Sequence, residues 1–248
     1  MSDVVPPRPD RPVETGRPRS SWRWWEAVGV YLLSLFVASL VTLPIFVAIH
    51  PESLANLVAS AAIAVVNVAI LLFWLSRRHP GWAGAIGFPS RVLPEIVAGV
   101  GFGAILYPGV AFGIGLVINL ILHEISGRTV TTPDQIPSHL APFGLAITIL
   151  YALVVAPIHE ELFFRGILFR SLRDRYGFGV GGWTSGVAFG LVHYIPGPFL
   201  DSLLLMSIMV FTGFALAYLY ERRGNIVAPM VAHATFNTIG LVAIWLIR

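Results

Sequence analysis

The sequence predicts an all-α, polytopic transmembrane helical bundle of about seven to eight spans with a cytoplasmic N-terminus. Three observations support this fold class. Hydrophobic residues make up 56% of the 248-residue chain and charged residues only 12%, whereas soluble domains carry about 25% charged residues. The mean hydropathy is +0.78. Apolar stretches of about twenty residues, the length that crosses a bilayer, recur along the chain, with the arginines grouped between them.

The first element is a tail over residues 1–21, which is rich in Pro and Arg and has no apolar face. Such a segment cannot bury enough apolar surface to fold, so we expect a disordered cytoplasmic tail. Trp22, Trp24 and Trp25 follow and indicate an anchor at the membrane interface. Residues 22–142 then form a set of N-terminal scaffold helices, because the polar residues within apolar stretches concentrate after residue 155.

The apolar stretches define the expected spans. They are 26–48, 54–75, 95–122, 143–172, 179–195, 200–220 and 226–247. The fourth is too long for one simple span, so we expect its end, Phe169 to Tyr176, to run along the cytoplasmic surface. The fifth is short and Gly-rich. The run Gly177 to Gly190 indicates close helix packing, since it lacks the Lys-Ser/Thr of a phosphate-binding loop.

The arginines orient these spans. If seven spans alternate, most arginines fall on one side and few on the other. The first group is Arg8, Arg11, Arg17, Arg19, Arg23, Arg77, Arg78, Arg91, Arg170, Arg173, Arg175, Arg222 and Arg223; the second is Arg128 and Arg248. The positive-inside rule makes the arginine-rich side cytoplasmic. The opposite side receives the longest expected loop, 123–142, with Pro133, Pro137 and Pro142.

The composition also excludes several kinds of chemistry. The chain contains no cysteine, which excludes disulfides, thiolate catalysis and cysteine-bound metals. It contains no lysine, which excludes a lysine nucleophile or Schiff base. The net charge of +3 could suggest a nucleic-acid ligand, but the arginines lie in the tail and in short loops, where they set membrane topology.

Ionisable residues within the apolar stretches are the candidate site. An ionisable side chain at membrane depth costs about 2.5–3.5 kcal/mol on insertion scales, so such residues are usually functional. Glu161 and Arg165 are spaced i,i+4 and can pair on one helix face. Glu160 points about 100° away and stays available as a base or ligand.

Two further pairs repeat the i,i+4 spacing in later spans. They are Phe189 with His193, and His233 with Asn237. Two histidines and a carboxylate can hold a zinc ion with a water in its open position, which makes Glu160, His193 and His233 a possible metal set. Equally, a Glu–His pair can activate water without a metal while His233 and Asn237 donate to an oxyanion. Both alternatives remain open, with one divalent metal or none.

These three motifs, in this order, resemble the CPBP family of intramembrane proteases, also called ABI. The motifs read Glu160-Glu161-x-x-x-Arg165, Phe189-x-x-x-His193 and His233-x-x-x-Asn237, and the resemblance covers about residues 145–240. The family includes the endopeptidase that removes the last three residues of CaaX proteins, and bacterial proteins of bacteriocin processing and self-immunity. It is often classed with the metalloproteases.

The resemblance implies an intramembrane endopeptidase with residues 143–248 as its catalytic core. It implies that Glu160 and His193 activate water, that His233 and Asn237 stabilise the oxyanion, and that Glu161 with Arg165 organises the site. The expected partners are the lipid bilayer and a peptide or protein substrate entering from the membrane or cytoplasmic side. We expect a multi-pass protein of the bacterial inner membrane and no nucleic-acid ligand.

Other functions compete with this hypothesis. His159 begins a sequence like the zincin H-E-x-x-H, but Phe163 stands where that motif requires its second histidine. Ser185 lies in a stretch that faintly resembles an intramembrane serine protease, but Trp183 stands where that motif requires glycine. A non-enzymatic membrane protein, for bacteriocin immunity or as a transport accessory, would use the polar cluster to hold helices together. A channel or proton-coupled transporter is a third alternative.

The remaining histidines fall in expected loops or at span ends and are not expected to act. They are His50, His79, His123 and His139. Phe189 is expected to shape packing rather than chemistry.

Overall fold

Helices joined by short loops make up the protein in the computed structural model, which describes residues 18–133 and 141–247. The described residues contain no β-strand. The first half comprises α1 (Trp24–Ala48), α2 (Glu52–Arg78), the short α3 (Trp82–Ile86), α4 (Leu93–Tyr107), the π-helical η1 (Pro108–Ile114) and α5 (Gly115–Ser126). The second half comprises α6 (Pro142–Leu150), η2 (Tyr151–Val155), α7 (Ala156–Glu161), η3 (Leu162–Phe169), α8 (Arg170–Leu191), α9 (Phe199–Arg223) and α10 (Val227–Ile247).

Six helices of the described residues are long and apolar enough to cross a membrane, which confirms the predicted all-α membrane bundle. Side chains such as Leu33 and Val47, which are 61% and 82% exposed, face outward, as expected where lipid replaces water. Four of the six helices match the expected spans 26–48, 54–75, 200–220 and 226–247 to within a few residues. The third runs without a break from Leu93 to Ser126. The remaining helix, Pro142–Leu191, contains both the fourth and the fifth expected spans.

This long helix reverses direction at Gly177. Gly177 has φ 83° and ψ 173°, a conformation that glycine adopts without the steric cost of a side chain. Beyond it, Ser185 Oγ donates a hydrogen bond of 2.8 Å to the carbonyl of Phe164. A Cβ on Gly181 would lie 2.9 Å from the backbone nitrogen of Arg173. Residues 178–191 therefore run back along residues 162–176, and the short fifth segment is a separate arm of a helical hairpin.

Glycines bring this returning arm close to α9. A Cβ on Gly190 would lie 2.6 Å from the carbonyl oxygen of Met206, and one on Gly186 would lie 2.8 Å from that of Val210. On the facing helix, a Cβ on Gly213 would lie 2.9 Å from Cα of Gly186. No larger residue fits without moving a backbone, which confirms the close packing predicted for the Gly-rich run.

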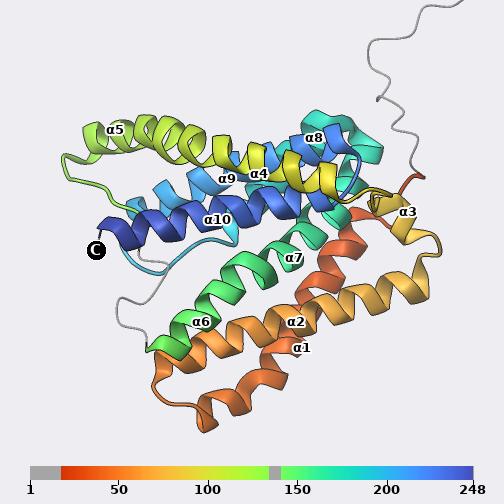
Figure 1. The fold of residues 1–248 in the computed structure, drawn as a ribbon, viewed down its shortest axis with the longest axis horizontal. Coiled ribbons are helices and arrows are strands. Elements are labelled where there is room, and N and C mark those ends of the chain that lie inside the picture. The colour runs from red at the N-terminus through yellow and green to blue at the C-terminus, as the bar shows by residue number, and fades with distance from the viewer. Residues whose placement is uncertain (1–17, 134–140, 248) are drawn as a thin grey trace, which may run out of the picture.

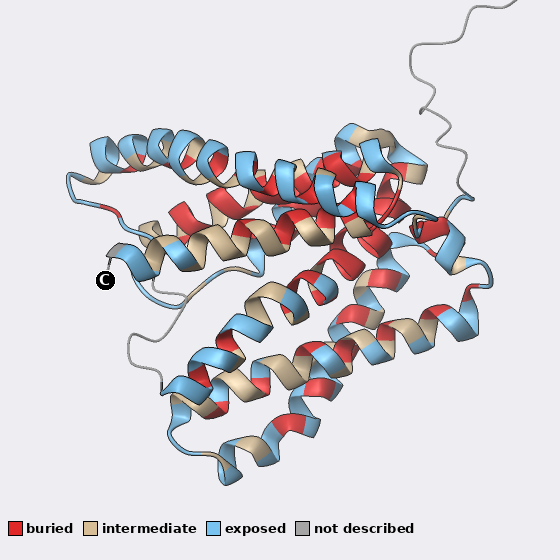
Figure 2. Cartoon of the chain, viewed as in Figure 1, coloured by how far each residue is buried: buried red, intermediate tan, exposed pale blue. Residues whose placement is uncertain are grey.

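Figure 1 shows two groups of helices, with α1, α2, α6 and α7 on one side and α4, α5, α8, α9 and α10 on the other. Buried residues gather near α3 and α8, whereas α5 is mostly exposed (Figure 2). The packed core therefore lies toward one end of the bundle.

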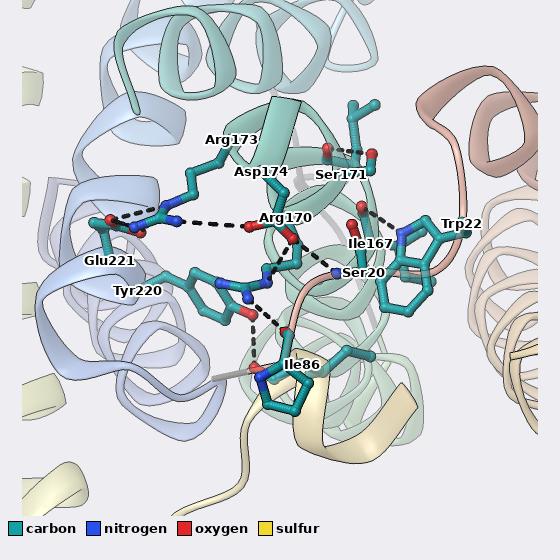
Figure 3. A network of polar contacts seen from close by, with 12 residues as sticks. Ser20, Trp22, Ile86, Ile167, Arg170, Ser171, Arg173, Asp174, Tyr220 and Glu221 are labelled. Atoms are coloured by element: carbon teal, nitrogen blue, oxygen red, sulfur yellow. Dashed lines mark hydrogen bonds and ion pairs between the residues drawn. The ribbon is translucent and has the colours of Figure 1, made fainter. Parts of the chain in front are cut away.

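That end is the arginine-rich end, formed by residues 18–23, 79–92, 170–177 and 222–225. Figure 3 shows its polar network. Arg173 donates to Glu221 of α9, with its shortest bond at 2.7 Å, and Arg170 lies 3.2 Å from Asp174. The phenol of Tyr220 donates a 2.6 Å hydrogen bond to the carbonyl of Ile86. The loops that the arginine pattern assigned to one side therefore meet at one end of the structure.

The N-terminal segment joins this network before α1 begins. The carbonyl of Pro18 accepts a 2.7 Å hydrogen bond from Arg170, and the backbone nitrogen of Ser20 donates to Asp174 at 2.8 Å. The indole of Trp22 donates to the carbonyl of Ile167 at 3.0 Å (Figure 3). Disorder was expected over residues 1–21, and that prediction is wrong for residues 18–21, because buried charges of α8 give them fixed partners. The rest of the expected tail, 1–17, lies outside the described residues.

The opposite, arginine-poor end carries the loop that follows α5. Arg128 forms a 2.9 Å ion pair with Asp201 at the start of α9, and Asn119 donates a 2.7 Å hydrogen bond to the carbonyl of Val130. The expected loop 123–142 is partly helical, because α5 extends to Ser126. Its middle, 134–140 with Pro137, lies outside the described residues.

Candidate active site

The three sequence motifs meet within the bundle. Glu160 and Glu161 end α7, and Arg165 follows in η3. His193 lies just beyond α8, and His233 and Asn237 lie on α10. The hairpin reversal at Gly177 brings His193 back beside α7. Four of the six predicted site residues line one cavity: Glu160, His193, His233 and Asn237. Glu161 and Arg165 are fully buried and do not line it.

Glu161 is the buried centre of the constellation. Its side chain has no exposed surface, nor has that of Arg165, which donates to Glu161 Oε1 at 2.8 Å. This contact confirms the predicted i,i+4 pair. His233 Nδ1 lies 2.9 Å from the same oxygen. Since an ionised carboxylate can only accept, His233 donates from Nδ1. One carboxylate therefore ties α7 to both η3 and α10.

Arg165 is held by more than its ion pair. Its second terminal nitrogen donates to the carbonyl of Gly213 at 3.2 Å, a contact that the close α8–α9 packing allows. The guanidinium lies 4.4 Å from the ring centroid of Phe189, close enough for a cation–π interaction. Phe189 is fully buried, and its ring centroid lies 4.6 Å from that of His193. The ring thus packs between the arginine and the imidazole, as the packing prediction for Phe189 expected.

The end of α8 orients His193. The backbone nitrogen of His193 bonds to Gly190 at 3.1 Å, which tightens the last turn. The carbonyl of Phe189 accepts from His193 Nδ1 instead, at 2.7 Å. Helix C-termini leave such carbonyls without backbone partners. Because a carbonyl can only accept, Nδ1 carries the proton and Nε2 presents a lone pair to the cavity.

Glu160 faces both histidines. Its Oε2 lies 3.9 Å from Nε2 of His193 and 3.9 Å from Nε2 of His233. This oxygen is buried and accepts no hydrogen bond from any described residue. Leaving a buried carboxylate oxygen unpaired is costly. A small polar species between the three groups would satisfy it.

The 3.9 Å distance from Glu160 Oε2 to each imidazole nitrogen can be compared with the distances expected around a zinc ion and around a water molecule. Ligand atoms of a tetrahedral zinc ion with bonds of 2.0–2.1 Å lie about 3.3–3.4 Å apart. Two groups that share one water through hydrogen bonds of about 2.8 Å lie about 4.6 Å apart at a tetrahedral angle. The observed 3.9 Å lies between these two values, so the distance alone fits either species. No group of three metal-binding side chains among the described residues has metal-site geometry. The tautomers nevertheless suit a metal, since both Nε2 atoms are free.

Asn237 lies one helical turn beyond His233. Its Nδ2 donates a 2.8 Å hydrogen bond to the carbonyl of Ala152 in η2, and its side chain lines the cavity. An amide nitrogen carries two N–H groups, so one remains for another acceptor. The contact also fixes α10 against η2.

The cavity that holds these residues has a volume of about 960 Å³. Tyr31 and Phe164 line it near the arginine-rich end, and Asn56, Phe112 and Thr132 line it near the arginine-poor end. Its lining therefore extends from Glu160 toward the arginine-poor end.

A buried polar chain next to the site was missed by the sequence analysis. His159 Nε2 lies 3.0 Å from Oδ1 of Asn67, whose Nδ2 donates to Ser34 Oγ at 2.6 Å. Ser34 donates in turn to the carbonyl of Tyr31 at 2.8 Å. The chain links α7 to α2 and α1. Asn67 and Ser34 are single polar residues within apolar stretches, and that interruption is the signal that could have found them.

Other candidates do not join the site. Ser185 is fully buried and uses its hydroxyl on the Phe164 carbonyl, which disfavours serine catalysis. His79 contacts Ser21 at the arginine-rich end, and His123 contacts the carbonyl of Arg128 at the other end. His50 follows α1 at that same end. His139 lies outside the described residues.

Comparisons with known proteins point to one family. Residues 142–239 match the family model "Type II CAAX prenyl endopeptidase Rce1-like". A Bacillus subtilis (strain 168) protein named "Putative membrane peptidase YdiL" is 38% identical over 95 residues, 38% of this chain and 36% of that protein. An "Uncharacterized 24.3 kDa protein" of Escherichia coli is 26% identical over 96 residues, 39% of this chain and 43% of that protein. The matches thus span less than half of either relative. No solved structure matches the chain.

Proposed function

We propose that this multi-pass membrane protein is an intramembrane endopeptidase, and the match of residues 142–239 to the Rce1-like family model supports this. Glu160 acts as general base on a water that attacks a peptide carbonyl. The observation that carries the proposal is the unpaired Oε2 of Glu160, placed 3.9 Å from two imidazole nitrogens. A water fits between these groups and would be polarised by them.

Each residue has a role in this reaction. Glu160 accepts a proton from the water, and His193 Nε2 accepts the second hydrogen bond of that water. The new oxygen–carbon bond leaves a tetrahedral oxyanion. His233 donates to it from Nε2 when that nitrogen carries a proton, while Glu161 accepts the hydrogen bond from Nδ1. Asn237 supplies the free N–H of its amide. The proton held by Glu160 passes to the leaving amine, and the peptide bond breaks.

A divalent metal would use the same residues. Glu160 and the two free Nε2 atoms of His193 and His233 would hold a zinc ion, which would lower the pKa of its bound water. Glu161 would then fix His233 from behind, as outer carboxylates do for metal-bound histidines.

The test is cleavage of quenched fluorescent peptides by the purified protein in detergent, comparing wild type with Glu160→Gln. General bases contribute about 10²–10⁴-fold, and we expect a loss of that size. Glu124→Gln, the same change at an exposed position of α5, should cleave like wild type. Thermal unfolding confirms that each variant is folded.

A chelator separates the two chemistries. Cleavage that survives 1,10-phenanthroline favours water activated by Glu160 and His193 alone. Cleavage lost with 1,10-phenanthroline, but kept with the non-chelating 1,7-isomer, favours zinc. A folded wild type that cleaves no peptide of any class, or a Glu160→Gln variant that stays active, would overturn the proposal and favour the non-enzymatic alternative.

A further inference from the structure

The cavity has an inner and an outer end that differ in exposure. Its inner lining residues Phe189, Thr212 and His233 are all 4% exposed or less. Its lining residues Asn56 and Ser60 of α2 are exposed, and so is Tyr194, which follows His193. The exposed residues all lie on the side of the site away from the arginine-rich end.

The arginine-rich end closes the cavity. Arg165, Phe164 and Phe189 lie beneath the site and are at most 1% exposed. Farther on, the Trp22–Ile167 hydrogen bond and the Arg170 and Arg173 network join the elements of that end (Figure 3). Among the described residues, none of 18–23, 79–92, 170–177 or 222–225 lines the cavity.

The lining has a distinct chemistry. Glu160 is the only carboxylate among the lining residues, which include no arginine and no aspartate. Ser53, Asn56, Ser60 and Thr132 provide hydrogen-bonding groups at the outer end, and most other positions are aliphatic or aromatic. A charged side chain placed among the aliphatic and aromatic lining residues, away from Glu160, would lose its hydration without gaining a charged partner, which costs several kcal/mol. An extended peptide with uncharged side chains would instead use the polar groups for its backbone.

From these observations we infer that the substrate is an extended, uncharged peptide segment that reaches Glu160 from the arginine-poor end. By the positive-inside rule this end faces away from the cytoplasm. The inference rests on the proposed protease function and adds to it the side of entry and the chemistry of the segment.

The test measures sidedness in membrane vesicles from cells that express the full chain. A membrane-impermeant quenched peptide of uncharged residues is added to right-side-out vesicles and, separately, to inverted vesicles. We expect cleavage with right-side-out vesicles, and cleavage with inverted vesicles only after detergent is added. Cleavage by intact inverted vesicles alone would overturn the side of entry.

Detergent separates this inference from the function itself. In detergent both ends are accessible, so Glu160-dependent cleavage there tests the protease activity regardless of side. Activity in detergent with the wrong sidedness rejects the inference alone. Absence of activity in detergent rejects the protease function, and the inference falls with it.

A pair of variants tests the route through the cavity. Ser60→Trp places an indole at the outer end, whereas Ser39→Trp makes the same change at an exposed position of α1 outside the cavity. We expect kcat/KM in detergent to fall about tenfold or more in Ser60→Trp and to stay unchanged in Ser39→Trp. Asn56→Trp serves if Ser60→Trp does not fold. Equal activity of all folded variants would overturn the route.

The substrate chemistry is tested with matched peptides. Replacing one uncharged residue with Lys or Asp, at a position of the peptide beyond the reach of Glu160, should lower kcat/KM about tenfold or more. Equal cleavage of charged and uncharged peptides would reject this part of the inference.

Discussion

The arginine-rich network and the Glu160 centre both place ionisable side chains inside the protein, but they complete their contacts differently. In the network, Glu221 lies 2.7 Å from an Arg173 nitrogen and Asp174 lies 3.2 Å from one of Arg170. At the centre, Oε2 of Glu160 has imidazole nitrogens at 3.9 Å and accepts no hydrogen bond from a described residue. Carboxylates that contact arginine directly hold helices together, whereas a carboxylate held apart from its neighbours has space for a reactant.

Glu161 lies between these two kinds of environment. It contacts Arg165 as the network carboxylates contact their arginines, yet it also contacts His233. Substituting Glu161 should therefore lower both stability and activity. Substituting Glu160 should lower mainly activity, and substituting Glu221 mainly stability.

The largest effect on stability is expected at Glu161. Glu161→Gln removes the counterion of a fully buried arginine, and breaking such a pair costs about 3–5 kcal/mol. It also removes the acceptor that orients His233, so cleavage by the folded fraction should fall as well. Thermal unfolding in detergent and peptide cleavage measure the two effects.

The double variant Glu161→Gln/Arg165→Met provides the control. It removes both charges, so it should unfold at a higher temperature than Glu161→Gln alone while remaining poorly active. A single variant as stable as wild type would show that the pair is not needed for the fold.

A smaller effect is expected at Glu221. Glu221→Gln weakens the hydrogen bonds that Glu221 accepts from Arg173, at 2.7 to 3.1 Å, at a partly buried position. Weakening hydrogen bonds of a buried charged group should cost about 1–3 kcal/mol of unfolding free energy. Cleavage by the folded protein should not change. Glu52→Gln, at an exposed position of α2, should change neither stability nor cleavage. Loss of cleavage in folded Glu221→Gln would show that the arginine-rich network also acts in catalysis, which contradicts the comparison.

A smaller effect still is expected for the polar chain beside the site. Asn67→Leu leaves His159 and Ser34 without their partner, and interhelical hydrogen bonds in membrane proteins contribute about 0.6–2 kcal/mol. The thermal midpoint should fall modestly. Asn119→Leu is the matched control, because it removes an amide hydrogen bond to Val130 at the arginine-poor end, away from the site. A thermal midpoint for Asn67→Leu equal to that of wild type would show that the hydrogen bonds of Asn67 do not contribute to stability.

The smallest effect concerns pH at the arginine-rich end. Burial lowers the pKa of His79, which lies beside Trp22 and Trp74, below the usual value near 6.5. The unfolded chain then binds more protons than the folded one between the lowered pKa and about 6.5. The contribution of His79 is fully present above that pH and is lost as the pH falls through this window.

Thermal unfolding as a function of pH measures this contribution. The drop in stability below about pH 6.5 should be shallower in His79→Gln than in wild type. Identical slopes would exclude His79 as a source of the pH dependence.

The features that the sequence predicted correctly depend on the spacing of residues within one helix or on the number of alternating spans. The Glu161–Arg165 pair follows from four-residue spacing, and the meeting of the arginine loops follows from alternating spans. The Glu161–His233 bond joins residues 72 positions apart, and His159 meets Asn67 across 92 positions. Such contacts depend on which helices are neighbours, and a single sequence does not contain that information.

The two spans expected within residues 143–195 are both present as the two arms of the hairpin that reverses at Gly177. One expectation near the N-terminus was wrong for a physical reason. The order of residues 18–21 was missed because their partners, Arg170 and Asp174, lie about 150 positions away. The direction of the cavity depends on the packing of all the helices and could not be read from any one span.

The hairpin at Gly177 has a consequence for synthesis. Glu160 and His193 lie on its two arms, so they can meet once this hairpin has formed. His233 follows about 40 residues later, which corresponds to a delay of several seconds at translation rates of about 5–20 residues per second. During that interval both residues of the Arg165–Glu161 pair have been made and can meet, while the site still lacks its second imidazole. The full set of site residues is present only after α10 has been made.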